Sequence, residues 1–261
     1  MERRVSPCLR PPRHVYEWDD EVMHIAAVPG NGGTTARWEL LPDPLAPGST
    51  LHPVVLPGFD GTPLMPGEPT ADAFAAALRD AVEALPRPRV VFATGIGGSI
   101  ALHAAQERGW ADGFILHAPV GPNLDTRLLP QLMRPMIVRA AAKAAIASPV
   151  GRAIGRRRYS NVPADTIDRV LGAYARCDAF EPMWDILNAD WWDALDPIAD
   201  PAVLVWGAGD GVLSADHAEK FRRVLPDATF RTEDEWAHYP MLEQPADFAR
   251  AIDELARGLV E

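Results

Sequence analysis

The sequence predicts an α/β protein with a mostly parallel, doubly wound sheet and a helical insertion. Six short β-type apolar runs alternate with amphipathic helical patterns, at the spacing of β–α–β units. Between the fourth and fifth runs, residues 121–196 carry several helical patterns and no clear strand. A chain of 261 residues is long enough for one large core domain that includes such an insertion.

Each predicted strand is an apolar run of strand length, and the first two end in glycine-rich turns at residues 29–33 and 57–61. Four segments have apolar residues at helical spacing and are predicted to cover the sheet. The predicted strands are residues 22–28, 51–56, 90–93, 113–117, 202–206 and 228–231. The predicted helices are residues 70–85, 96–108, 215–224 and 245–259.

These elements predict how the domains are organised. Residues 1–20 are rich in Pro and Arg and are expected to form an irregular arm. Residues 21–120 and 197–261 form the predicted core, and residues 121–196 the helical cap. We expect the cap to cover the carboxyl ends of the strands, where open α/β sheets bind ligands.

Composition argues against several classes of protein. The net charge of −11 disfavours nucleic acid or an anionic membrane as a partner. Cys8 and Cys177 form no CxxC pair, which favours a reducing, cytoplasmic location without a disulfide framework. The N-terminus lacks the apolar segment of a secretory signal. The most apolar helical stretch, residues 137–146, contains Arg139 and Lys143 and is too short to span a bilayer.

Neither a cofactor nor a metal is predicted. The glycine-rich segments 30–33 and 95–98 do not complete a dinucleotide fingerprint, and neither contains the lysine of a phosphate-binding loop. Five histidines are scattered without the spacing of metal ligands, namely His24, His52, His103, His117 and His217.

One strand–turn–helix segment has an unusual residue at its turn. Residues 89–104 have the layout of a nucleophile elbow, in which a serine normally occupies the tip of the turn. Gly95 occupies that position here and has no side chain that could attack a substrate. Ser99 is one turn into the predicted helix, and Thr94 is expected to point away from the site. We therefore expect no covalent acyl-enzyme.

Four motifs around this turn resemble those of the α/β-hydrolase superfamily, of the small, helical-capped type. Residues 29–33 resemble the oxyanion turn, with Pro29 in place of the usual His, and Trp38 follows at the expected place. Residues 57–61 resemble the turn after the next strand. Residues 206–210 and 237–245 resemble the segments that supply the acid and the catalytic His, in the family's order.

The resemblance implies roles for particular residues. His238 would be the base, and Asp210 would orient it and stabilise its protonated form. The backbone N–H groups of Asn31 and Ile96 would form an oxyanion hole, the latter at a helix N-terminus. Four aromatic residues are expected in the substrate pocket, namely Trp38, Trp184, Trp191 and Tyr239.

The functional prediction is an enzyme that has kept this base and oxyanion hole but not the nucleophile. It would catalyse elimination, conjugate addition with C–C bond formation, or cyclisation of a small carbonyl compound, as in natural-product biosynthesis. A related option is direct hydrolysis by a water next to Gly95. Two alternatives stay open: a serine esterase or thioesterase whose nucleophile was replaced by glycine, and a ligand-binding pseudoenzyme. The oligomeric state is not predicted.

Overall fold

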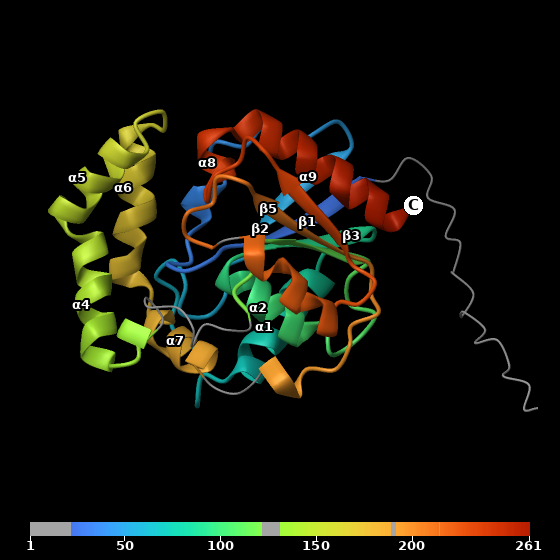
Figure 1. Ribbon diagram of the computed structural model, residues 1–261, viewed down its shortest axis with the longest axis horizontal. Coiled ribbons are helices and arrows are strands. Elements are labelled where there is room, and N and C mark those ends of the chain that lie inside the picture. Colours follow the sequence, from blue (N-terminus) through green and yellow to red (C-terminus); the bar gives the residue numbers. More distant parts are fainter. Residues whose placement is uncertain (1–21, 122–130, 189–191, 214) are drawn as a thin grey trace, which may run out of the picture.

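The computed structural model describes residues 22–121, 131–188, 192–213 and 215–261, and a six-stranded sheet lies at its centre (Figure 1). All neighbouring strands are parallel, and their order is β2-β1-β3-β4-β5-β6. The parallel α/β fold predicted from the sequence is therefore confirmed. The strands are β1 (Met23–Val28), β2 (Ser49–Pro53), β3 (Arg89–Thr94), β4 (Gly113–His117), β5 (Ala202–Gly207) and β6 (Thr229–Glu233).

The central strands are apolar along their whole length because helices cover both faces of the sheet. Every residue of β3, β4 and β5 is buried. Successive side chains of a strand point to opposite faces. In β3, Val91 and Ala93 join the core on one face, whereas Val90 and Phe92 join the core on the other.

The helices α1 (Ala71–Glu83) and α2 (Ile96–Ala104) pack on one face of the sheet, and α8 (Pro240–Glu243) and α9 (Pro245–Val260) lie on the other (Figure 1). Thr70 caps α1 by accepting a hydrogen bond of 3.2 Å from the backbone N–H of Ala73. These layers bring the carboxyl ends of the strands together at one edge of the molecule.

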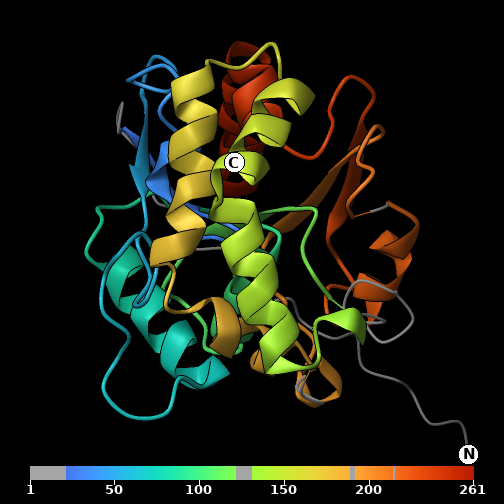
Figure 2. The same ribbon diagram turned by 90° about the vertical axis from the view of Figure 1, so that its left-hand side faces the viewer.

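A group of helices between β4 and β5 stands at that edge, and Figure 2 turns it toward the viewer. The group contains α4 (Met136–Ala147), α5 (Pro149–Arg158), α6 (Ala164–Gly172), the short 3₁₀ turn η2 (Ala173–Arg176) and α7 (Phe180–Asn188). It is held to the core through Glu39, whose carboxylate accepts hydrogen bonds from Thr166 at 2.5 Å and from Nε of Arg169 at 3.0 Å.

Some predicted boundaries differ from those observed. β2 ends at Pro53 rather than residue 56, because this edge strand reaches a proline, which has no N–H to donate to a ladder. The helix predicted over residues 215–224 is a 3₁₀ helix, η4 (Ala215–Arg223). The predicted arm, residues 1–20, lies outside the described residues, and the proposed domain boundaries stay predictions. In the described part of the chain, no helix is long and apolar enough to cross a membrane.

Candidate active site

Gly95 forms a sharp turn between β3 and α2. Its φ of 56° and ψ of −119° lie in a region that glycine adopts at little cost and other residues adopt under strain. Its N–H donates to the carbonyl of His117 at 3.1 Å, and its own carbonyl accepts from the N–H of Val120 at 3.0 Å. These bonds tie the turn to the end of β4, so the turn keeps its shape without a side chain at its tip.

The space above Gly95 is open. A Cβ atom added there would have the Cα of Gly30 as its nearest neighbour, at 3.8 Å, which is an ordinary van der Waals distance. Two residues further on, a Cβ added to Gly97 would lie 2.6 Å from the carbonyl oxygen of Pro29. The first turn of α2 is thus pressed against the loop after β1, whereas the tip of the elbow opens into a cavity.

His238 and Asp210 come from the loops after β6 and β5 and meet beside this turn. The Nδ1 atom of His238 lies 2.9 Å from Oδ2 of Asp210. An ionised carboxylate only accepts hydrogen bonds, so Nδ1 carries the proton and Nε2 of the neutral imidazole keeps its lone pair. The sequence prediction placed these two residues together, and the structure brings them into direct contact.

Asp210 is held in its ionised form. Burial by itself would raise the pKa of this carboxyl, but the bond from His238 and the backbone N–H groups of Leu213 and Val212 outweigh burial and lower the pKa. Both N–H groups donate to Oδ1 at 2.8 Å. A carboxylate that stays charged in a buried place can both orient an imidazole and stabilise its protonated form.

A second histidine lies behind the dyad in a different state. His117 is fully buried at the end of β4, and burial, together with the nearby His238, lowers the pKa of its imidazole to about 3. Its Nδ1 shares a hydrogen bond of 3.0 Å with the hydroxyl of Thr94. His117 is therefore a neutral structural residue of the elbow and not a second base.

The two predicted oxyanion-hole residues, Asn31 and Ile96, both line the cavity next to Gly95. Ile96 is the first residue of α2, where backbone N–H groups and the helix dipole favour negative charge. The turn that holds Asn31 is closed by a bond of 3.0 Å from the N–H of Gly33 to the carbonyl of Gly30. In the described part of the chain, neither Asn31 nor Ile96 uses its N–H in a hydrogen bond, so both amides remain for a ligand.

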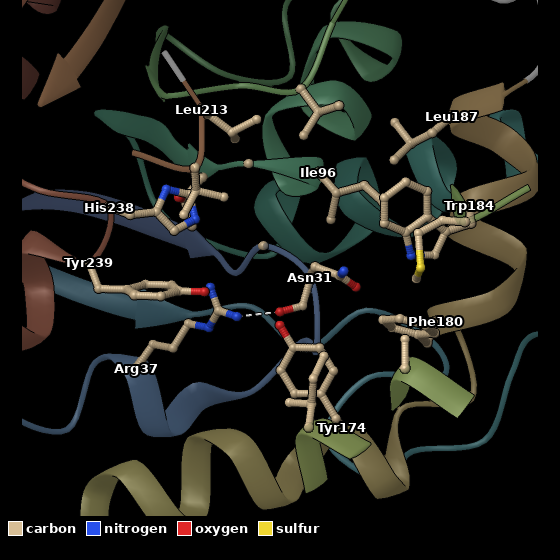
Figure 3. Close-up of a pocket in the computed structure, with 18 residues that line it drawn as sticks. Asn31, Arg37, Ile96, Tyr174, Phe180, Trp184, Leu187, Leu213, His238 and Tyr239 are labelled. Atoms are coloured by element: carbon tan, nitrogen blue, oxygen red, sulfur yellow. Dashed lines mark hydrogen bonds between the residues drawn. The ribbon is translucent and has the colours of Figure 1, made fainter. Parts of the chain in front are cut away.

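The cavity measures about 300 Å³ and is mostly apolar (Figure 3). This volume is at the small end of the usual range for ligand pockets. Trp184 and Tyr239 lie in its wall, as the sequence predicted. The segment between β4 and β5 supplies most of the remaining wall, with Met133, Ala142, Ile146, Tyr174, Phe180 and Leu187.

Of the other two predicted pocket residues, one lies elsewhere and one falls outside the described residues. Trp38 is buried on the opposite side of the sheet, with its ring centroid 5.6 Å from that of Phe92, and does not line the cavity. That prediction is wrong because the short helix η1 (Thr35–Arg37) turns the chain inward just before Trp38. Trp191 lies outside the described residues.

Among the described residues, no Ser, Thr or Cys side chain takes the place of the missing nucleophile. Among the described residues that line the cavity, Thr94 is the sole Ser, Thr or Cys, and its hydroxyl is bonded to His117. Ser99 donates its hydroxyl to the carbonyl of Val120 at 2.6 Å and does not line this cavity. Within the described chain there is also no group of three or more His, Cys, Asp or Glu side chains that could hold a metal.

Arg37, which the sequence did not single out, lines the cavity beside Asn31 (Figure 3). Its guanidinium donates from Nη2 to the carbonyl of Asn31 and lies 5.1 Å from the ring centroid of Tyr239. The sequence gives little sign that Arg37 faces a pocket, because Arg37 immediately precedes the more conspicuous Trp38.

The model of the alpha/beta hydrolase family matches residues 25–251 of the chain. A pimeloyl-[acyl-carrier protein] methyl ester esterase of Aromatoleum aromaticum is 28% identical over 250 residues, which cover 85% of this chain and 93% of that protein.

Solved structures resemble the whole fold. The N-formylmaleamic acid deformylase of Pseudomonas putida has a TM-score of 0.71 at 18% identity, with 88% of this chain and 92% of that chain covered. An esterase of Exiguobacterium antarcticum has a TM-score of 0.68 at 13% identity, with 91% and 92% covered. At such low identity these two likenesses show the fold alone.

Proposed function

Because this chain belongs to the alpha/beta hydrolase family, we propose that it is an enzyme that uses His238 and Asp210 as a general base without forming an acyl-enzyme. One observation carries this proposal. His238 and Asp210 form a bond of 2.9 Å beside a sharply turned elbow, although Gly95 at its tip supplies no nucleophile.

The proposed reaction starts with proton abstraction from a small carbonyl compound. Nε2 of His238 takes a proton from a carbon or hydroxyl of the substrate, and the electron pair moves toward the carbonyl oxygen. The N–H groups of Asn31 and Ile96 stabilise the enolate or alkoxide that develops. The protonated imidazole, paired with Asp210, then gives the proton to the departing group in an elimination, or to the enolate or alkoxide that remains after the new bond forms in an addition or cyclisation. Elimination, conjugate addition with C–C bond formation, and cyclisation all proceed through such a step.

A second candidate is ester hydrolysis by water, which the open space above Gly95 and the relationship to an esterase favour. Here His238 would take a proton from a water molecule in that space. The water oxygen would form the new bond to the carbonyl carbon, and the leaving alkoxide would recover the proton from the imidazolium. Neither candidate passes through an intermediate that is covalently bound to the protein.

Two probes test the proposal and separate the candidates. The first is 2-octanone in D₂O, whose α-hydrogen exchange is followed by NMR. The second is p-nitrophenyl hexanoate, whose hydrolysis is followed by absorbance while intact mass spectrometry looks for an acylated protein. We expect His238-dependent exchange for the first candidate and His238-dependent hydrolysis without an adduct for the second.

Two outcomes would overturn the proposal. A covalent acyl adduct on the natural chain would show that another group replaces the serine. If the natural chain shows no exchange and no hydrolysis above the rates of a His238→Ala variant, the result would favour a ligand-binding protein without activity.

A further inference from the structure

Among the described residues that line it, the cavity has one buried cation and no anion to match it. Arg37 is the sole Lys or Arg among the described cavity-lining residues, and no Asp or Glu is among them. Its residue surface is only 2% exposed. A buried charge is costly unless it is paired or fully hydrogen-bonded. The groups around Arg37 therefore indicate whether it has a structural role or binds a ligand.

The guanidinium of Arg37 is incompletely satisfied by the protein. Nη2 donates to the backbone carbonyl of Asn31, and the ring face of Tyr239 lies 5.1 Å away, whereas Nε is buried without a hydrogen-bond acceptor. In Figure 3, Arg37, Tyr174 and Tyr239 point toward one another beside Asn31. Among the described residues, no carboxylate forms an ion pair with Arg37.

The other ionisable groups near Arg37 do not supply the missing negative charge. Burial raises the pKa of the Tyr159 phenol to about 12 and that of the Cys177 thiol to about 11, and it raises the pKa of the Tyr174 phenol further still. All three are therefore neutral at pH 7. Glu243, whose charge also acts on Tyr159, makes no ion pair with Arg37 among the described contacts.

Two other buried arginines show how this protein satisfies a guanidinium that serves structure. Arg89 donates to the carbonyls of Trp110, Glu83 and Leu85 at 2.7–2.8 Å. Arg139 pairs with Asp185 at 2.5 Å and donates to three backbone carbonyls. Arg37, in contrast, lines a cavity, has neutral partners in the carbonyl of Asn31 and the hydroxyl of Tyr174, and leaves its Nε without an acceptor.

Arg37 also lies close to the reaction centre. A Cβ added to Gly30 would be 3.4 Å from Nη1 of Arg37, while the Cα of Gly30 is the atom nearest to a Cβ on Gly95, at 3.8 Å. Gly30 thus lies between the guanidinium and the elbow. A group bound by Arg37 would be a few bonds away from a carbonyl held by Asn31 and Ile96.

We propose that Arg37 binds a carboxylate of the ligand, so that the cavity selects small oxo acids or carboxylated esters with an apolar remainder. The guanidinium supplies the charge, and the apolar wall from Phe180, Trp184 and Leu187 receives the remainder. This inference rests on the proposed function for the position of the reacting carbonyl, but the binding of a carboxylate is measured without turnover.

The experiment compares two probes of the same shape, octanoate and octanamide, by isothermal titration calorimetry on the full chain at pH 8. They differ in charge at one end. A hydrogen bond to a charged group is worth about 1.5–3 kcal/mol, so we expect octanoate to bind roughly 10- to 100-fold more tightly. Equal affinity for the two probes on the natural chain would overturn the inference before any variant is made.

Variants of single residues show which side chain causes the preference for octanoate. Arg37→Met should remove most of the preference for octanoate while the affinity for octanamide, which reports the state of the cavity, changes little. Arg37→Lys should retain part of it. Arg176→Met is the matched control, because it removes the same charge from a side chain that is 60% exposed and outside the cavity. A preference that survives in Arg37→Met would place the carboxylate elsewhere, such as the oxyanion hole.

The same data separate this inference from the proposed function. His238→Gln should abolish turnover and keep the preference for octanoate. If the natural chain is inactive toward both reaction probes but still prefers octanoate through Arg37, the catalytic proposal fails and the carboxylate site stands. If Arg37→Met weakens both probes equally, Arg37 serves only to hold the Asn31 turn and the inference fails.

Discussion

Nδ1 of His238 lies 2.9 Å from Oδ2 of Asp210, a side chain with no exposed surface, at the edge of a cavity whose elbow carries a glycine. The contact joins loops that are 28 residues apart in the sequence. Since Asp210 is also bonded to two backbone N–H groups, its position is determined independently of any nucleophile.

The dyad should be essential to whichever reaction the chain catalyses. Asp210→Asn replaces an acceptor by a group that can donate to Nδ1, so His238 would carry its proton on Nε2 and lose its basic atom. We expect a loss in kcat on the order of 10³–10⁴-fold, measured with the probe that the natural chain turns over. His103→Gln is the control, since His103 lies outside the cavity. An Asp210→Asn variant with more than a tenth of the natural kcat would contradict the assigned role.

A serine at position 95 should fit and become acylated. The nearest atom to an added Cβ is 3.8 Å away, so the cost of Gly95→Ser is the positive φ rather than a clash. With His238 and the amides in place, p-nitrophenyl hexanoate should acylate the variant and add one hexanoyl mass. Gly95→Ala has the same steric demand but no hydroxyl, and it should show no adduct. Failure of the folded serine variant to acylate would indicate that His238 cannot reach position 95.

Close packing beneath the elbow should make Gly97 intolerant of any side chain. An added Cβ would lie 2.6 Å from the carbonyl oxygen of Pro29, and overpacking of this kind costs about 1–3 kcal/mol of unfolding free energy. Gly258→Ala is the matched control in α9, where a Cβ meets nothing within 4 Å. It should stabilise the fold by about 0.5–1 kcal/mol through helix propensity. Urea unfolding of Gly97→Ala and Gly258→Ala measures the difference in stability. Equal unfolding midpoints for the two variants would contradict the packing described.

The neutral state of His117 should make stability depend on pH. The pKa of its imidazole falls from 6.5 to about 3 on burial, so between these values the unfolded chain binds a proton that the folded chain does not. The contribution of His117 to stability is therefore complete above pH 6.5 and is lost as the pH falls toward 3, by up to about 1.4 kcal/mol per pH unit. Urea unfolding from pH 4.5 to 7.5 should give a shallower slope for His117→Gln than for the natural chain. An unchanged slope would contradict this state.

The parallel sheet and the dyad could be predicted because both leave local signals in the sequence. β4 was predicted at its observed bounds, since a buried parallel strand is a short apolar run between polar turns. His238, Asp210 and Gly95 were singled out because their segments resemble the acid, histidine and elbow motifs of the α/β-hydrolase superfamily, and each lies in a loop or turn that follows a strand. Parallel strands bring such loops to one edge of a sheet, which is consistent with the contact that the structure shows.

Which residues line the cavity depends on the tertiary structure. Trp38 and Arg37 are adjacent in the sequence, yet one packs against Phe92 in the core and the other lines the cavity beside Asn31. Periodicity over a three-residue 3₁₀ turn is too short to say which side chain faces which way. The sequence by itself determined the fold class and the glycine at the elbow, and its resemblance to a known superfamily pointed to His238 as the candidate base. Only the packing of η1, η2 and α7 around the turn after β1 placed an unpaired guanidinium next to them, because burial of a charge depends on contacts between segments far apart in the chain.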